Sequence, residues 1–328
     1  MQAAVYDRYG PPDVLQLATL DDPVPAPDAV LIRIRAAAVA AEDCLFRRGR
    51  PLAARLATGP VRPRVPVLGS SLAGDIVAVG AAVRRFRPGQ RVFAASDSGF
   101  GAHAGAVCLP ADGALAPLPA RLDYAEAVSL CAGGLTALPF LRDAGRIRRG
   151  QRVLVIGASG SVGTAAVQLA VHFGAEVTGV CSTAHLELVL ALGAERAIDY
   201  TREDCTRTAK RYDIVFDTAG KSSFARCRGV LRRGGVYLAT VLTPAILLQT
   251  LWTRIPGGRR ARIMFTGLRP AADKARDLAF LGALADAGAY RPVIDRLYPL
   301  ERIVEAHRYV EQGHKQGNVI VLPAHAGA

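Results

Sequence analysis

The stretch that decides the fold runs from Val153 to Gly163 and reads Val-Leu-Val-Ile-Gly-Ala-Ser-Gly-Ser-Val-Gly. Its four apolar residues predict a buried strand, and the small residues after them predict a tight turn into a helix from about Ser161 to Phe173. A glycine loop between a buried strand and a helix is the context that a dinucleotide-binding fingerprint requires. The N–H groups at such a helix start bind phosphates.

Two glycines of this loop are expected to have different roles. Gly160 would let the backbone approach a pyrophosphate, whereas Gly163 would permit close packing of the helix on the strand. Ala158 stands where the fingerprint has its first glycine. A glycine turn without a ligand is the alternative, and the flanking strand and helix weigh against it. The predicted phosphate-loop residues are Ser159, Gly160, Ser161, Val162 and Gly163.

The residues after the next predicted strand, 176–181, bear on the choice between NADPH and NADH. Sites for NADH usually carry an Asp or Glu about 20 residues past the glycine loop. Ser182 and Thr183 stand there instead. Hydroxyls can donate to a 2′-phosphate that a carboxylate would repel, so the sequence favours NADPH. Both residues could also cap the next helix.

Working outward, the chain changes character near Leu122. Beyond it, short apolar runs alternate with helical patterns, which predicts a doubly wound parallel α/β sheet. Before it, β-like runs separated by Gly and Pro predict an antiparallel, barrel-like domain. The predicted strands of the parallel sheet are residues 153–156, 176–181, 197–198, 212–216 and 236–241. Two further helices, near residues 273–287 and 300–312, precede a last strand at 318–322.

The composition suits a two-domain globular enzyme. The chain has 328 residues, of which 51% are hydrophobic. Its six cysteines form no C-x-x-C pair, which favours free thiols in a reducing compartment. We expect no signal peptide and no membrane span, and therefore a cytoplasmic protein. The net charge of +13 comes from scattered arginines without base-stacking aromatics, which argues against nucleic acid as a partner.

The sequence resembles the medium-chain dehydrogenase/reductase superfamily, and within it the zinc-independent quinone oxidoreductase-like branch. The motifs that carry the resemblance are Tyr9-Gly10-Pro11-Pro12-Asp13-Val14-Leu15, Gly133-Gly134-Leu135-Thr136-Ala137, the loop from Gly157 to Gly163, Leu192-Gly193-Ala194, Ile198-Asp199-Tyr200, Phe216-Asp217-Thr218-Ala219-Gly220 and Gly317-Asn318-Val319-Ile320. The resemblance implies a GroES-like antiparallel β-barrel domain, residues 1–122 and 270–328, with a Rossmann dinucleotide-binding domain, residues 123–269, inserted into it. It also implies a homodimer. Further predicted cofactor contacts are Tyr200, Thr218, Val241 and Asn318.

The same resemblance predicts that the protein has no zinc. Zinc-dependent relatives carry a His and a Glu directly after the glycine of a segment matching Pro66-Val67-Leu68-Gly69, but this chain has Ser70 and Ser71. Catalytic zinc needs about three protein ligands. Cys44 and Cys131 lie near the relevant regions and are expected to be core cysteines.

The chain also departs from the quinone oxidoreductase pattern. Relatives commonly have an Asn, followed three residues later by an Asp and then by a Tyr; here Ala40 and Leu45 replace the Asn and the Tyr. Asp43 remains, and its i, i+4 spacing to Arg47 predicts an ion pair. The relatives' basic contact to the 2′-phosphate is absent, since Ala184-His185-Leu186 stands in its place.

Without a metal to polarise an alcohol or ketone oxygen, hydride transfer favours acceptors that conjugation already activates: quinones, enones and enals. Thr136 and Ser71 are the predicted catalytic donors to the developing oxygen, with Ser70 as a further candidate, and Thr136 is favoured because relatives often place it beside the nicotinamide. No side chain is a clear proton donor. Predicted substrate-cleft residues are Phe100, His103, Leu247, Leu248 and Trp252. His103 suits an exposed loop equally well.

Two other functions stay open at this point. One is a biosynthetic tailoring enzyme that acts on a conjugated intermediate, with or without net redox chemistry. The other is an NADPH-binding sensor with little turnover. The apolar run from Ile246 to Trp252 could also touch a membrane or a partner, although burial in the cleft or in a dimer contact is favoured.

Overall fold

The computed structural model describes residues 1–50, 52, 55–96, 100–253 and 258–324. The chain divides into two compact units. Unit 1 comprises residues 1–132, 267–287 and 292–328, and unit 2 comprises residues 133–266 and 288–291. These boundaries differ from the predicted ones, because residues 123–132 and 267–269 belong to unit 1 and helix α3 (Tyr124–Pro139) contributes to both units.

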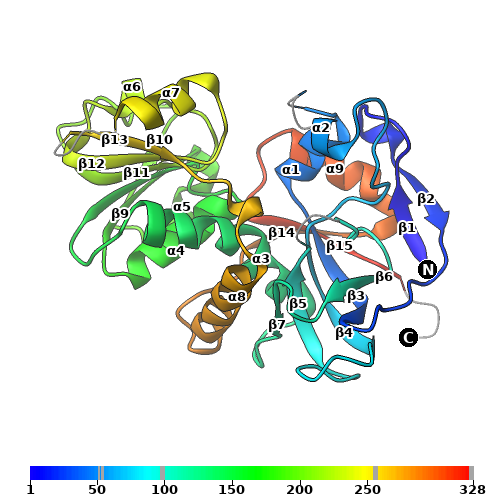
Figure 1. The fold of residues 1–328 in the computed structure, drawn as a ribbon. Helices are drawn as coiled ribbons and strands as arrows, with labels where there is room; N and C mark the ends of the chain where they lie inside the picture. Colours follow the sequence, from blue (N-terminus) through cyan, green and yellow to red (C-terminus); the bar gives the residue numbers. More distant parts are fainter. Residues whose placement is uncertain (51, 53–54, 97–99, 254–257, 325–328) are drawn as a thin grey trace. The chain divides into compact units, whose positions relative to one another are not determined.

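Unit 2 contains a six-stranded sheet with the strand order β10-β9-β8-β11-β12-β13 (Figure 1). Its strands are β8 (Arg152–Ile156), β9 (Glu176–Cys181), β10 (Arg196–Asp199), β11 (Tyr212–Asp217), β12 (Leu231–Ala239) and β13 (Arg260–Ile263). Every neighbouring pair is parallel. The chain winds from β8 outward to β10 and then restarts at β11, so the order reverses between β8 and β11. This is the switch point where such sheets bind ligands.

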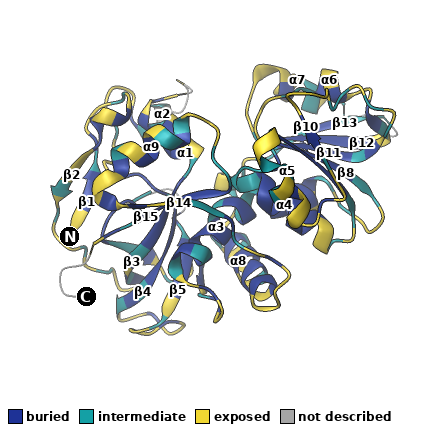
Figure 2. Ribbon diagram, turned by 180° about the vertical axis from the view of Figure 1, so that it is seen from behind, coloured by how far each residue is buried: buried dark blue, intermediate teal, exposed yellow. Residues whose placement is uncertain are grey.

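The helices of unit 2 precede the first of these parallel strands or connect one strand with the next. They are the C-terminal part of α3, which continues as the π-helical turn η3 (Phe140–Ala144), then α4 (Ser161–His172), η4 (Thr183–His185), α5 (Leu186–Ala191), α6 (Phe224–Cys227) and α7 (Pro244–Trp252). The strands are largely buried, as Figure 2 shows, and their core includes Leu154, Val215 and Tyr237. Burial on both faces explains why these strands read as continuous apolar runs. The doubly wound α/β sheet is therefore confirmed.

Unit 1 is built from both ends of the chain around a seven-stranded sheet of order β14-β15-β3-β4-β5-β7, with β6 on β3. The strands of this sheet are β3 (Ala29–Val39), β4 (Ser71–Val79), β5 (Arg91–Ala95), β6 (Ala106–Pro110), β7 (Leu115–Pro117), β14 (Ile294–Pro299) and β15 (Asn318–Leu322). A separate two-stranded antiparallel sheet consists of β1 (Gln2–Val5) and β2 (Gln16–Thr19). Strand β15 pairs antiparallel with β3, which joins the two ends of the chain in one sheet. The GroES-like architecture is confirmed.

Short helices complete unit 1. They are η1 (Pro12–Val14), α1 (Ala41–Arg47), α2 (Arg55–Thr58), η5 (Thr266–Leu268, at the boundary of the two units), α8 (Ala271–Asp286), η6 (Leu300–Arg302) and α9 (Ile303–Glu311). Helix α1 follows directly on β3, and β4 begins two residues after Gly69. The fold thereby brings the segment of residues 40–47 beside the segment of residues 69–71.

One helical stretch, Tyr124–Ala144, is long and apolar enough to pass a membrane-span test. Of its most apolar window, 72% is buried inside the protein. A core helix has this character because it must be apolar on most of its surface.

Candidate functional site

The conformation of the glycine loop between β8 and α4 is fixed by its backbone geometry and by a hydrogen bond from β11. Gly157 has a φ of +80°, and a β-carbon there would lie 2.7 Å from Cβ of Ala219. The Thr218 hydroxyl donates to the carbonyl oxygen of Ile156 at 2.9 Å and so braces the loop from β11. Gly157 is thus required by the turn itself, a role that the sequence analysis did not assign.

Gly163 has the packing role that the sequence predicts. A β-carbon at this position would lie 2.0 Å from the carbonyl oxygen of Gly157. The first turn of α4 therefore packs directly against the loop backbone, and any side chain would force the two apart.

Gly160 differs, because the protein itself does not require a glycine there. Its φ of −77° is open to any residue. A β-carbon would have only the carbonyl oxygen of Gly157 within 4 Å, at an ordinary 3.6 Å. Gly160 is the N-cap of α4, and no side chain caps this helix or adds an acid to its first turn. An uncapped helix start beside open space fits the phosphates of a dinucleotide.

His185, which lies in η4 just after β9, links that segment to the glycine loop. Its Nδ1 lies 3.1 Å from the Ser159 hydroxyl and 3.4 Å from the Ser182 hydroxyl. Ser182 makes no capping hydrogen bond to the next helix. The sequence shows His185 only as the absence of a basic residue, yet in the structure it contacts both the glycine loop and Ser182.

A carboxylate that the sequence analysis missed lies at this same edge. Asp199 ends β10, which places it opposite Cys181 in the sheet. It accepts hydrogen bonds from Thr183 and Thr201, which lower its pKa below the usual range. The Thr183 hydroxyl therefore donates to Asp199 in this structure, and its contact with a 2′-phosphate stays a prediction. Arg202, 3.6 Å away, offsets part of the negative charge.

The remaining predicted cofactor residues fall into two groups. Tyr200 and Val241 follow the ends of β10 and β12 and are 57% and 45% exposed, so both are available to a ligand in unit 2. Asn318 lies in unit 1, is 4% exposed, and donates its side-chain amide to the carbonyl oxygen of Val293 at 3.1 Å. Asn318 is thus engaged within its own unit.

The two predicted catalytic residues lie in different units. Thr136 is half-buried on α3 in unit 2, and Ser71 is buried at the start of β4 in unit 1. A β-carbon on Gly133 would lie 2.4 Å from the carbonyl oxygen of Ser161, so α3 packs tightly on the start of α4. Because residues three apart share a helix face, Thr136 lies on the side of α3 that approaches the glycine loop.

A second polar cluster forms in unit 1, where α1 meets the segment before β4. Asp43 is fully buried and accepts hydrogen bonds from the backbone N–H groups of Ala40, at 2.7 Å, and Gly69, at 3.1 Å. Desolvation raises the pKa of Asp43 to about 7, although these hydrogen bonds oppose the rise. Next to this clamp, the Ser70 hydroxyl donates to Oε1 of Glu42 at 2.7 Å.

The predicted Asp43–Arg47 ion pair is wrong. Arg47 is fully buried and pairs with Glu311 of α9, which also binds Arg48. The i, i+4 spacing permits a surface pair, but Asp43 turns inward to satisfy two backbone N–H groups that would otherwise be buried without a partner.

The predicted placement of His103 is also wrong, in both of its versions. The side chain is fully buried rather than in a cleft or an exposed loop. Its Nε2 lies 3.0 Å from the carbonyl oxygen of Ala38, and its ring meets that of His307 edge-on, 5.5 Å between centroids. Desolvation lowers the pKa of His103 to about 4.

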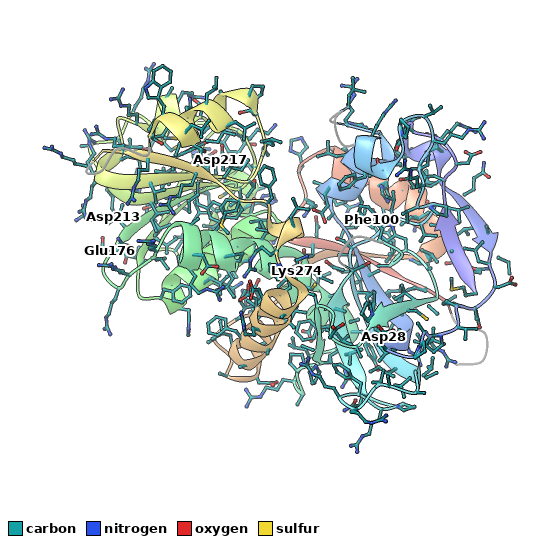
Figure 3. All side chains as sticks on the ribbon, viewed as in Figure 1. Asp28, Phe100, Glu176, Asp213, Asp217 and Lys274 are labelled. Atoms are coloured by element: carbon teal, nitrogen blue, oxygen red, sulfur yellow. The ribbon has the colours of Figure 1, made fainter. Side chains whose placement is uncertain are left out.

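The other predicted substrate residues do not gather in one unit. Phe100, labelled in Figure 3, is half-buried in unit 1 with its ring 5.0 Å from that of Phe46. Leu247, Leu248 and Trp252 lie on α7 in unit 2 and are 42%, 63% and 80% exposed. A hollow between α7 and β13 is lined instead by Thr250, Thr253 and residues 260–264, together with Asp143 and Ala144.

The cysteines near the relatives' zinc positions do not form a metal site. Among the described residues, no three His, Cys, Asp or Glu side chains come together as ligands. Both Cys44 and Cys131 are buried, and burial raises the pKa of each thiol to about 12. Cys131 donates to the carbonyl oxygen of Ala94. The donor set does not fit zinc.

Comparison with known proteins agrees with both units. Residues 26–120 match the model of the alcohol dehydrogenase GroES-like domain, and residues 192–321 match that of a zinc-binding dehydrogenase. An NADPH-dependent alkenal/one oxidoreductase of Arabidopsis thaliana is 33% identical, over 98% of this chain and 80% of the relative.

Two solved structures are similar over nearly the full length. The quinone oxidoreductase from Coxiella burnetii has a TM-score of 0.88 at 27% identity, covering 98% of this chain and 99% of its own. The Escherichia coli quinone oxidoreductase, solved with NADPH, has a TM-score of 0.83 at 25% identity, covering 98% and 100%. The protein is an NAD(P)H-dependent reductase of the quinone oxidoreductase type. The chain belongs to the medium-chain dehydrogenase/reductase superfamily, in its quinone oxidoreductase-like branch.

Proposed function

We propose that this protein uses NADPH, without zinc, to reduce a conjugated acceptor: a quinone, an enone or an enal. The observation that carries the proposal is the open space at Gly160, beside an uncapped helix start at the switch point of the sheet. The cofactor supplies a hydride from its nicotinamide ring. An acceptor activated by conjugation needs no Lewis acid to receive it.

The preference for NADPH is supported by relatives and by the polar groups near Ser182. The Arabidopsis relative is named as NADPH-dependent, and the Escherichia coli structure contains NADPH. Ser182 and His185 offer hydrogen bonds at the expected 2′-position, and Tyr200 is exposed near it. The negative charge of Asp199 opposes a preference for NADPH. Its carboxylate, however, accepts hydrogen bonds from two threonines and pairs with Arg202.

The residues of this chain would bind and orient rather than transfer groups themselves. The loop backbone and the α4 start would hold the phosphates, and Thr136 would lie beside the nicotinamide on the α3 face that approaches the loop. Ser71 and Ser70 would donate hydrogen bonds to the oxygen of the reduced acceptor. Such donors stabilise the negative charge that develops there.

The test is NADPH oxidation by chelator-treated protein, with p-benzoquinone and crotonaldehyde as acceptors. We expect turnover with at least one of them and no gain on adding zinc. Tight NADPH binding without turnover across a wider acceptor panel would favour a sensor instead. One tightly bound zinc per chain in protein purified without chelator would overturn the zinc-free proposal.

We further propose a homodimer in the cytoplasm, with no membrane span and no nucleic-acid partner. Strand β13 lies at an edge of the six-stranded sheet, and α7 beside it exposes Leu248, Leu251 and Trp252. An exposed strand edge with an apolar helix is a common dimer contact. The six cysteines are unpaired, which suits a reducing compartment. Sedimentation equilibrium tests the dimer, and a purely monomeric protein would contradict it.

A further inference from the structure

The reduction of a conjugated acceptor consumes one hydride and one proton. The sequence alone predicts no side chain that would donate this proton. Hydride addition to an enone or a quinone leaves an enolate or phenolate oxygen that must be protonated. A side-chain acid beside a donor to that oxygen is therefore what the chemistry requires. Ser70 and Ser71 are the proposed hydrogen-bond donors to this oxygen. An acid in contact with either serine could replace the proton that the serine gives up.

Glu42 is the carboxyl group in contact with Ser70. It lies in the first turn of α1, and its Oε1 accepts from the Ser70 hydroxyl at 2.7 Å. A second hydrogen bond supports this contact. Asp43, next to Glu42, accepts from the N–H of Gly69, one residue before Ser70. Two adjacent side chains of α1 thus bind two adjacent residues of the facing segment. This double contact fixes the carboxyl group of Glu42 against Ser70.

Glu42 is an exposed residue, and its surroundings favour the protonated form of its carboxyl group. Desolvation and then the neighbouring Asp43 raise the pKa of Glu42 above its usual range, while the hydrogen bond from Ser70 and the charge of Lys274 oppose the rise. Lys274, labelled in Figure 3, belongs to α8, where its ammonium group donates to the carbonyl oxygen of Gly267 at 2.7 Å. The neutral thiol of Cys131 on α3 is near enough for the charges of Glu42 and Lys274 to affect its pKa.

We propose that Glu42 is the proton donor of the reaction and acts through the Ser70 hydroxyl. This inference rests on the proposed function. The Ser70 proton passes to the oxygen of the reduced acceptor, and the Glu42 carboxyl proton passes to Ser70 Oγ. The nicotinamide supplies the hydride and with it both electrons, and the pair of residues supplies the one proton. Glu42 is left as a carboxylate that accepts from Ser70, as in the structure, and water reprotonates it.

The test compares Glu42→Gln with the wild type in NADPH oxidation by crotonaldehyde. Glutamine keeps an acceptor for the Ser70 hydroxyl but has no acid proton to give. We expect kcat to fall about 100-fold, with KM and the NADPH dissociation constant changed less than about threefold. The wild-type kcat should fall as the pH rises through the pKa of Glu42, because the acid form is the active one, and this dependence should vanish in the variant.

The matched control is Glu305→Gln, which removes a surface carboxylate of the same unit that is paired with Arg302. It should leave kcat and the pH profile unchanged. Ser70→Ala interrupts the same path from the other side and should also lower kcat, which keeps the test decisive if Glu42→Gln does not fold. A folded Glu42→Gln protein with wild-type kcat and pH profile would overturn the proton-donor role alone. A wild type that binds NADPH but reduces no acceptor would overturn the proposed function and this inference together.

Discussion

The two units of the protein build their polar sites in opposite ways. In unit 2, the glycine loop presents backbone groups from seven consecutive residues, 157–163, and side chains mainly brace it. In unit 1, the cluster around Ser70 consists of side chains from α1, α3 and α8 and the segment before β4. A backbone site depends on local conformation, so it tolerates changes around it but not a side chain within it. A side-chain site depends on the packing of distant segments.

The largest expected effect breaks the fold of unit 2. Gly163→Val would place a branched side chain where even a β-carbon would lie 2.0 Å from the carbonyl oxygen of Gly157. We expect a loss of about 4 kcal/mol or more in the free energy of unfolding, because the nearest atoms belong to the backbone of Gly157 and Ala158 and cannot move aside. Thermal unfolding followed by circular dichroism measures it. A variant as stable as the wild type would contradict the packing role.

Gly160→Val should separate ligand binding from folding in the same loop. The protein leaves room for the new side chain, so stability should fall by only about 1 kcal/mol, as for a poorer N-cap. The side chain would occupy the space assigned to the pyrophosphate, and NADPH affinity should fall more than about 100-fold, or about 3 kcal/mol. Calorimetric titration and a melting curve on one sample measure both. Unchanged affinity in a folded protein would refute the phosphate-loop assignment.

Acid should remove the contribution that the buried His103 makes to the stability of unit 1, whereas the raised pKa of Asp43 acts in the opposite sense over the same pH range. His103 has a pKa of about 4 in the folded protein against 6.5 ordinarily, and burial also lowers the pKa of His307. Below pH 6.5 an unfolded His103 binds a proton that the folded His103 does not, so its contribution to stability is full above that pH and is lost as the pH falls toward 4. For His103 the loss amounts to about 3 kcal/mol.

Urea unfolding at several pH values measures this loss, and hydrogen exchange assigns it to a unit. His103→Gln keeps a donor for the carbonyl oxygen of Ala38 but does not titrate, so its stability should fall less steeply toward acid. An equal slope in the variant and the wild type would show that other groups control acid unfolding.

The smallest expected effect concerns the choice of cofactor. His185→Lys would place a permanent cation next to Ser182, where a 2′-phosphate is expected, and a charge-assisted hydrogen bond is stronger than a neutral one. The ratio of NADPH to NADH affinity should rise about fivefold, or about 1 kcal/mol. His185→Gln, which adds no charge, is the control. If the lysine variant strengthens both cofactors equally, the phosphate does not lie at this edge.

Local patterns determined the parts of the protein that depend on consecutive residues. The alternation of apolar strands and helices predicted the parallel sheet, because its central strands are buried on both faces and helices connect most of them. The loop from Gly157 to Gly163 predicted its own site, because backbone conformation depends mainly on the residues within the turn. The role of Gly163 followed from its spacing alone.

The tertiary structure decided everything that depends on which distant segments meet. His103 could not be placed from sequence, because nothing local shows that His307, about two hundred residues later, packs against it. The contact between Asp199 and Thr183 could not be predicted from the sequence, because β9 and β10 become neighbours only in the folded sheet. Glu42 and Ser70 are 28 residues apart and become a pair only when α1 docks on the segment before β4. Side-chain chemistry across such distances is set by packing, and packing is not visible in a local pattern.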